Sequence, residues 1–241
     1  MIPTNELVYR FKLEFDKLDS QDYPDVPLPQ ILTFLNKAII LYVQKCYGLN
    51  NNYNLGFEGD QKRIDDLSAL VVKDEPQIQY QNDSNIEEPR YYADISNLKK
   101  GKYLHLIRSL SYGDKGACKN RVLWNTQVTH DELDEVLVDP TRDPSFEWQE
   151  IPIVISQNKI YGYTDGTFKL NTLYIEYIKY PKEIDLISYT KFNGDPSQTI
   201  DSELPDYSLL DIVTLAVRLA QATISNVEGY QIAEKEVSKQ E

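Results

Sequence analysis

The spacing of apolar residues changes twice along this chain, and this change constrains the possible folds more than any other feature. Near both ends apolar residues recur every three or four positions, as on one face of an α-helix. In the middle they form short runs rich in strand-forming residues. The order predicts an α+β fold in which N- and C-terminal helices form a helical bundle with an inserted antiparallel β-rich domain. We expect residues 1–75 and 203–241 to form the bundle and residues 76–202 the inserted domain.

Three helices are expected in the first third of the chain and one near its end. The first follows Thr4, a good N-cap residue. The second runs from about Gln30 to Tyr47, where Gly48 favours a left-handed C-terminal cap. A shorter third helix fits Gln61–Val72, and the last begins at Pro205. The apolar stripes expected to be buried are, in chain order, Val8, Phe11, Phe15 and Leu18; Ile31, Leu35, Ala38, Ile39, Tyr42 and Cys46; Ile64, Leu67 and Val71; and Leu209, Val213, Ala216, Ala220 and Ile224.

Six candidate strands lie in the middle of the chain. The clearest is Thr172–Tyr180, in which Leu173, Ile175 and Tyr177 share one face. Pro152 predicts either an edge strand or a strand start, because proline cannot donate to a ladder. The Asp165-Gly166 pair predicts a hairpin between its two flanking strands. The remaining candidate strands are Tyr103–Leu110, Asn120–Val128, Gln149–Ser156, Lys159–Thr164 and Thr167–Leu170.

No pattern in the sequence selects a catalytic reaction. Of the two histidines, His105 lies in a strand-like stretch and His130 opens the acidic run His130–Glu135. This run is not the His-Glu-x-x-His of zinc proteases, so we interpret it as an acidic helix start or turn capped by Thr129 or Asp131, with a metal site as the alternative. Phosphate-binding glycine loops and the Gly-x-Ser-x-Gly elbow are absent. We therefore predict no catalytic, cofactor-binding or metal-binding residues, and a protein that is not an enzyme.

The charge balance is strongly acidic, with 25 basic and 38 acidic residues and a net charge of −13. Proteins that grip nucleic acid usually display a basic patch. Here the densest basic group is Lys99, Lys100 and Lys102, which we interpret as a solvated loop, with a phosphate site as the alternative. Acidic surfaces repel DNA, so we expect no specific DNA binding.

Cysteine usage and hydropathy bear on the compartment. Cys46 and Cys118 are expected to be reduced thiols, with Cys46 packed as a small hydrophobe and a disulfide between them as the alternative. The longest apolar stretches, such as Ala38–Val43, are too short to span a bilayer. The first residues lack the pattern of a secretory signal. We expect the protein to act in the cytosol or in an assembly built there, without a membrane.

Eighteen tyrosines are a further feature of the composition. One interpretation is cross-strand packing and protein–protein contact, since tyrosine has an apolar body and a polar tip. The other is a stacking platform for sugars or bases. We favour the first, because a subunit of an assembly needs large contact surfaces. Five of these tyrosines lie in candidate strands: Tyr161, Tyr163, Tyr174, Tyr177 and Tyr180.

Several segments, taken together and in order, resemble one protein family. They are Thr4–Leu7 with Tyr9–Phe11, Gln30–Ala38 with its central asparagine, Arg121–Trp124 through Asp139-Pro140 and Ser145–Trp148, Tyr174–Pro181, and Glu203–Pro205 leading into Ile212–Val217. In these segments the chain resembles the head-to-tail connector, or adaptor, ring proteins of tailed bacteriophages, especially those of the crAss-like phages. The match is weakest over residues 76–97, and the β-rich segment departs from small all-helical adaptors.

The resemblance implies a structural protein of the virion neck, assembled in the host cytoplasm. Such subunits form a homo-oligomeric ring, usually twelvefold, that contacts the portal protein and other neck or tail rings while DNA passes through its lumen. It also implies that the C-terminal tail, residues 230–241, docks on the portal or a neighbour; Tyr230, Ile232 and Val237 are its candidate contact residues. The alternatives are another virion structural role, a receptor- or carbohydrate-binding tail component built on the tyrosines, or an enzyme using His130.

Overall fold

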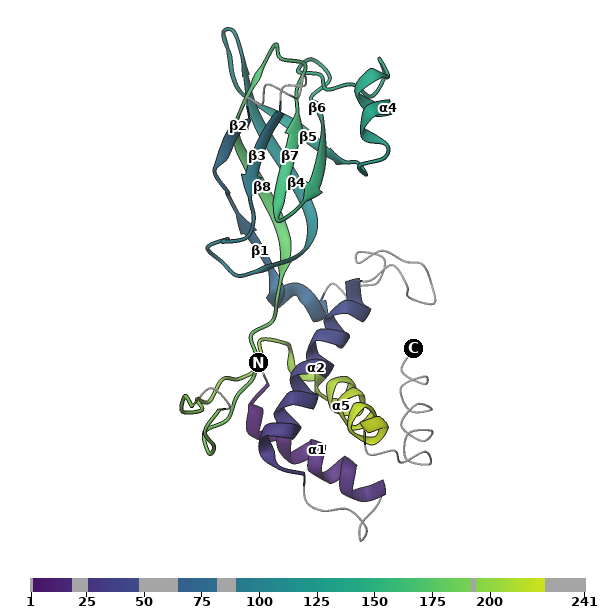
Figure 1. The fold of residues 1–241 in the computed structure, drawn as a ribbon, viewed down its shortest axis with the longest axis vertical. Coiled ribbons are helices and arrows are strands. Elements are labelled where there is room, and N and C mark those ends of the chain that lie inside the picture. The colour runs from purple at the N-terminus through teal and green to yellow at the C-terminus, as the bar shows by residue number, and fades with distance from the viewer. Residues whose placement is uncertain (1, 19–25, 48–64, 82–89, 192–193, 224–241) are drawn as a thin grey trace. The chain divides into compact units, whose positions relative to one another are not determined.

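The structure, a computed structural model, describes residues 2–18, 26–47, 65–81, 90–191 and 194–223 (Figure 1). Contacts divide the chain into two compact units. Met1–Leu70 and Pro181–Glu241 form the first, called here the helical unit. Val71–Tyr180 forms the second, called the sheet unit. Residues 181–202, which the sequence grouped with the strands, therefore belong with the helices.

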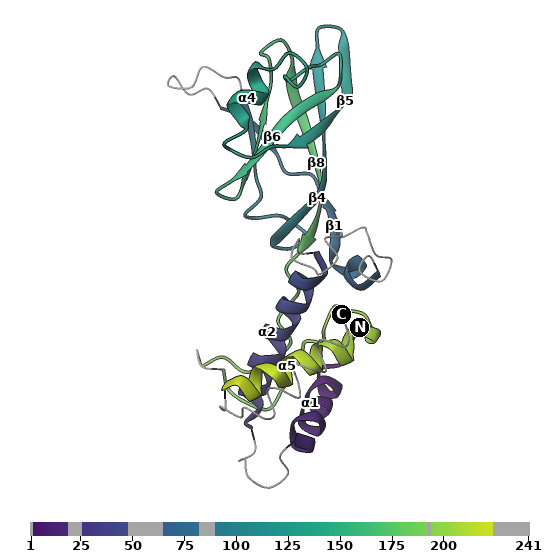
Figure 2. The ribbon, with the colours of Figure 1, turned by 90° about the vertical axis from the view of Figure 1, so that its right-hand side faces the viewer.

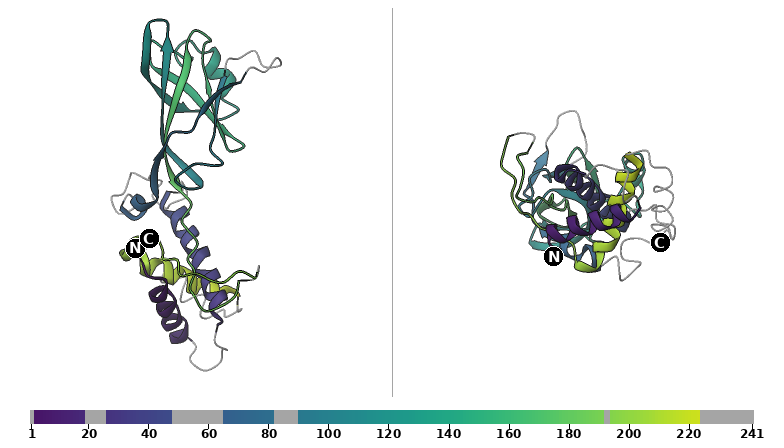
Figure 3. Two further views of the ribbon diagram at one scale, coloured as in Figure 1. Left: turned by 90° about the vertical axis from the view of Figure 1, so that its left-hand side faces the viewer. Right: turned by 90° about the horizontal axis from the view of Figure 1, so that it is seen from below.

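The described part of the helical unit contains three long α-helices, of which α5 packs against both others (Figure 3). They are α1 (Thr4–Leu18), α2 (Leu28–Tyr47) and α5 (Leu209–Thr223), with the short 3₁₀ helices η2 (Ser68–Leu70) and η3 (Asp206–Ser208). Every residue of the stripe predicted for α2 is buried. Val8 and Phe11 of α1 and the four predicted residues from Leu209 to Ala220 of α5 are buried as well. The predicted positions Ile64, Leu18 and Ile224 lie outside the residues whose side chains are described.

The sheet unit is one eight-stranded sheet with the order β1-β8-β4-β5-β6-β7-β3-β2, which curves around its own core (Figure 2). Tyr177, Leu123 and Ile151 are among its fully buried side chains. The strands are β1 (Val71–Asp74), β2 (Ile78–Gln81), β3 (Arg90–Asp94), β4 (Tyr103–Lys115), β5 (Cys118–Gln127), β6 (Glu150–Ser156), β7 (Lys159–Tyr163) and β8 (Lys169–Lys179), and the helix α4 (Leu133–Val138) lies between β5 and β6.

The predicted fold class, a helical bundle with an inserted antiparallel β-rich domain, is wrong. The protein is mostly a single mixed sheet accompanied by a few short helices. The sheet is mixed because β5 and β6 run parallel. Between them the chain makes a crossover that contains α4, and such a crossover returns it to the same end of the sheet.

The third predicted helix, Gln61–Val72, is helical over its described residues as far as Leu70 and ends as a strand. The chain passes from the 3₁₀ helix η2 directly into β1 at Val71, so the end of the predicted Gln61–Val72 helix is extended. Val71 pairs with Ile178 of β8, and the β-branched pair Val71-Val72 suits a strand better than a helix. Leu67 is buried as predicted.

The Asp165-Gly166 hairpin prediction is also wrong. This pair does form a turn, in which the Asp165 carboxylate accepts hydrogen bonds from the amide and hydroxyl of Thr167. The flanking strands do not pair, because β7 pairs with β6 and β3. β7 instead forms a hairpin with β6, whose turn residues Gln157 and Asn158 both have positive φ, as a type I′ turn requires.

Pro152 does not place β6 at an edge; it is the third residue of β6, near the strand start that was the other predicted position. β6 lies between β5 and β7, inside the sheet. Pairing with β5 includes Pro152, opposite Thr126, but pairing with β7 begins one residue later, at Ile153. The proline therefore lies where the β7 ladder has not yet started, so its missing N–H interrupts no pair with that strand.

Candidate functional site

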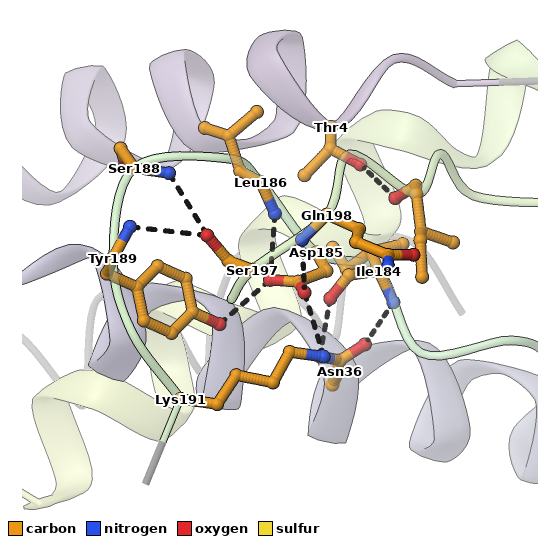
Figure 4. Close-up of polar contacts among 11 residues, drawn as sticks. Thr4, Asn36, Ile184, Asp185, Leu186, Ser188, Tyr189, Lys191, Ser197 and Gln198 are labelled. Atoms are coloured by element: carbon orange, nitrogen blue, oxygen red, sulfur yellow. Dashed lines mark hydrogen bonds and ion pairs between the residues drawn. The ribbon is translucent and has the colours of Figure 1, made fainter. Parts of the chain in front are cut away.

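The connection between β8 and α5 contains an irregular but tightly bonded loop, residues 185–191 and 194–200 of the described chain, called here the Asp185 loop (Figure 4). Two isolated bridges hold its arms together, one between Asp185 and Ile200 and one between Thr190 and Pro196. Gly194 has a φ of 87° and donates its N–H to the carbonyl of Lys191, which closes the outer turn.

Asp185 organises this loop from the inside. Its side chain is 5% exposed. The carboxylate accepts hydrogen bonds from the amides of Leu186 (2.9 Å) and Gln198 (3.1 Å) and from the Tyr189 hydroxyl (2.8 Å). The Lys191 ammonium lies 2.9 Å from the same carboxylate. Asp185 thus connects Leu186, Tyr189 and Lys191 on the first arm of the loop with Gln198 on the second arm.

The pKa of Asp185 reflects these contacts. Burial by itself raises the pKa of the carboxyl group, because the charged form loses water. The Lys191 ammonium, the Gln198 amide, the Tyr189 hydroxyl and the Leu186 amide outweigh burial and lower the pKa to about 2. The carboxylate is therefore charged at neutral pH, and its contacts serve the loop conformation.

Ser197 provides a second crosslink between the arms. Its hydroxyl oxygen accepts hydrogen bonds from the amides of Ser188 (3.1 Å) and Tyr189 (3.2 Å). Ser197 is buried, so these bonds are shielded from water.

Both ends of the loop are tied to helices. The Asn36 side chain on α2 donates to the carbonyl of Ile184 (3.1 Å) and accepts from its amide (2.8 Å). At the other end the Thr4 hydroxyl donates to the carbonyl of Ile200 (2.7 Å), and the Asp201 carboxylate accepts from the Thr4 amide (2.9 Å). The carboxylate of Asp201 thereby caps the N-terminus of α1, where free amides favour a negative charge.

The tied loop exposes an apolar side chain to solvent. Ile187 is 66% exposed, and its neighbour Ser188 is also exposed. Ile187 follows Asp185 by two residues and precedes Tyr189, so fixed contacts flank it on both sides. Ile187 is therefore an exposed apolar side chain held between residues with fixed contacts.

Sequence reasoning missed Asp185 and Ser197, and it singled out Asn36 without a role. A usable signal was present in the dense turn formers Asn193-Gly194-Asp195-Pro196-Ser197, which predict a turn. The partner of Asn36 lies 148 residues away along the chain, so no local pattern identifies it.

The predicted docking residues Tyr230, Ile232 and Val237 lie outside the described residues. His130 is exposed shortly before α4. Residues 130–132 form a turn that leads into α4, as predicted. The expected cap by Thr129 or Asp131 is wrong, because α4 is preceded by Glu132 as N-cap and that residue makes no side-chain capping bond. His105 lies on β4 opposite Ile178.

Other sequence-selected residues lie in both units. Cys46 is buried in the helical unit as predicted, Cys118 is exposed on β5, and both are free thiols. Within the described ranges no group of three or more His, Cys, Asp or Glu residues is arranged to hold a metal ion. The described helices include none with the length and apolar character needed to cross a membrane.

The five strand tyrosines do not share one face. Tyr177 is fully buried in the sheet core and Tyr163 is buried beneath α4. Tyr161 is half-buried, whereas Tyr174 and Tyr180 are exposed by more than a third. The tyrosines therefore divide between packing and surface.

No protein-family model and no curated protein matches this chain.

Proposed function

We propose that this chain is a non-enzymatic structural protein of a tailed-phage virion, a subunit of the head-to-tail connector ring that joins the portal to the tail and forms part of the DNA conduit. The ordered resemblance of its segments to connector proteins supports this role. The structural observation that carries the proposal is the Asp185 loop, a surface element held by buried polar contacts that exposes Ile187.

A loop fixed before assembly suits a ring subunit for a thermodynamic reason. Ordering a flexible side chain at an interface costs about 0.5–1.5 kcal/mol, and ordering a backbone residue costs more. Asp185, Ser197 and Asn36 remove this cost in advance by fixing both arms and one end of the loop. Each subunit then repeats the same contact around the ring without further ordering.

The charge of the chain is consistent with a conduit. A wall that releases DNA should hold phosphates weakly, and a net charge of −13 disfavours adhesion. We expect the purified protein not to bind duplex DNA at physiological salt. Tight binding under those conditions, measured by fluorescence anisotropy, would count against the conduit role.

The primary test is mass photometry of the protein alone and mixed with the portal ring of the same virus. We expect a discrete heavy complex on mixing, with a mass increment of about twelve chains of 27.9 kDa. Absence of a complex with the portal and with every other neck or tail ring protein would overturn the proposal.

A pair of variants tests the part played by the loop. Ile187→Asp places a charge on the exposed apolar side chain and should weaken assembly at least tenfold. Gln44→Glu adds one negative charge at an exposed position of α2 and serves as the matched control. Equal effects of the two variants would show that the loop is not the contact element.

The C-terminal tail is proposed as a second contact. Its Tyr230, Ile232 and Val237 are the residues we expect to dock on the portal or a neighbour. Removing residues 230–241 should weaken portal binding while the far-UV circular dichroism and melting temperature of the protein stay unchanged. Unchanged portal binding would exclude the tail from docking.

A further inference from the structure

The outer surface of β5, β4 and β8 carries aromatic, aliphatic and cationic side chains in one area. Trp124 is 50% exposed and Tyr174 is 38% exposed. Both lie directly opposite Leu110 of the central strand β4, one on each side. We call this area the Arg108 face, and its residues are Arg108, Leu110, Tyr112, Val122, Trp124, Tyr174 and Glu176. Glu176 lies opposite Arg108, and its carboxylate is ion-paired with Lys73 at 3.5 Å.

Side-chain contacts hold the Arg108 face in a defined arrangement. The Arg108 guanidinium carbon lies over the Trp124 ring, 5.3 Å from its centre. The Tyr112 and Tyr174 rings meet edge to face at 5.3 Å, and the Tyr174 hydroxyl is hydrogen-bonded to Glu75. Tryptophan, tyrosine and arginine are the residue types enriched at the energetic centres of protein interfaces.

The neighbouring part of the sheet surface is already covered by α4. Leu133 and the partly buried Leu137 pack there on Val154, Tyr161 and Tyr163 of β6 and β7. Among the described residues of the sheet unit, α4 is the single helix, and it packs on β6 and β7 (Figure 2). It therefore does not pack on the residues of the Arg108 face, which belong to β4, β5 and β8.

The free side of α4 has the complementary chemistry. Asp134, Glu135 and Val138 are exposed and lie within one helical turn of one another, and Val138 is 81% exposed. The chain has no lysine or arginine between Thr129 and Thr141. This side thus offers carboxylates beside an apolar group, whereas the Arg108 face offers a guanidinium beside an indole.

We propose that the Arg108 face binds the exposed side of α4 of a second copy of this chain. The inference rests on the proposed ring, because a closed ring requires two different complementary surfaces on each subunit. The Arg108 guanidinium pairs with the Asp134 or Glu135 carboxylate, and Val138 packs on Trp124. A sugar ligand fits the Arg108 face less well, because the guanidinium already lies over one face of the indole.

A charge exchange tests the proposal. Self-association of the full chain is measured by sedimentation velocity up to about 1 mM, a range that detects weak contacts. Arg108→Glu and Glu135→Arg should each weaken association about tenfold or more, and the double variant should restore it. Lys37→Glu changes the net charge as Arg108→Glu does, from an exposed position on α2, and should have no such effect. Failure of the double variant to restore association, or a wild-type chain that stays monomeric throughout, would overturn the inference.

Tryptophan fluorescence gives an independent readout, since the chain has only Trp124 and Trp148. In Trp148→Phe, emission from Trp124 should shift to shorter wavelength as association proceeds. In Trp124→Phe, emission from Trp148, which is 82% exposed, should not shift. Trp124-dependent binding of a glycan array without self-association would contradict the proposal and indicate a carbohydrate ligand. Portal binding is measured on the same variants. If the chain binds the portal but the double variant does not restore self-association, only this inference is refuted. The proposed ring is then still tested by portal binding.

Discussion

At the scale of single residues, Asp185 is the position where one side chain determines the conformation of a loop. Asp185→Asn removes the ion pair with Lys191 and weakens the bonds from Leu186, Tyr189 and Gln198. The change in pKa from 3.8 to about 2 corresponds to about 2 kcal/mol of folding free energy. We expect a fall in melting temperature of roughly 10 °C at pH 7, measured by circular dichroism. Glu183→Gln removes the same charge from an exposed neighbouring side chain and should have little effect.

The pH dependence of this residue has a defined sign. The folded-state pKa of Asp185 is lowered, so its stabilisation is complete above the unfolded value of 3.8 and is lost as pH falls through about 2. The difference in melting temperature between wild type and Asp185→Asn should therefore be largest above about pH 4 and shrink on further acidification. A difference that stays constant between about pH 6 and pH 2 would refute the assignment.

At the scale of elements, the sequence correctly predicted which residues of a single helix or strand are buried, but it did not predict which strands pair. The α2 stripe and the alternating residues of β8 were correct because burial follows the period of a helix or strand. The β7–β8 hairpin and the edge position of β6 were wrong because strand partners are set by tertiary structure. The hydrogen bonds between Asn36 and Ile184 could not be predicted from the sequence for the same reason.

Gly113 on β4 is an element-scale position that a small change should disturb. A Cβ added there would lie 2.5 Å from Leu123 Cδ1 and 3.2 Å from the Lys169 carbonyl oxygen. Leu123 is fully buried, so it has little room to move, and the β4 register shifts at this residue in both ladders. Gly113→Ala should cost about 1–3 kcal/mol by urea denaturation. Gly116→Asn is the control, because its site is open and asparagine tolerates positive φ; equal losses would contradict the packing argument.

At the scale of the whole molecule, the chain enters and leaves the sheet unit on paired strands. β1 and β8 are antiparallel neighbours, with Val71 opposite Ile178, so the two ends of the segment lie side by side. The sheet unit also encloses a core made only of its own residues. Segments with adjacent ends and a core of their own commonly fold as units.

Differential scanning calorimetry of the full chain should therefore resolve two unfolding transitions, because each unit loses its own core. The two single substitutions described above assign each transition to one unit. Asp185→Asn lies in the helical unit and should lower only one transition temperature, whereas Gly113→Ala lies in the sheet unit and should lower only the other. Because the substitutions act on separate cores, their effects in the double variant should add. A single transition that both substitutions lower would mean that the units unfold together, and the two cores would then stabilise each other instead of acting independently.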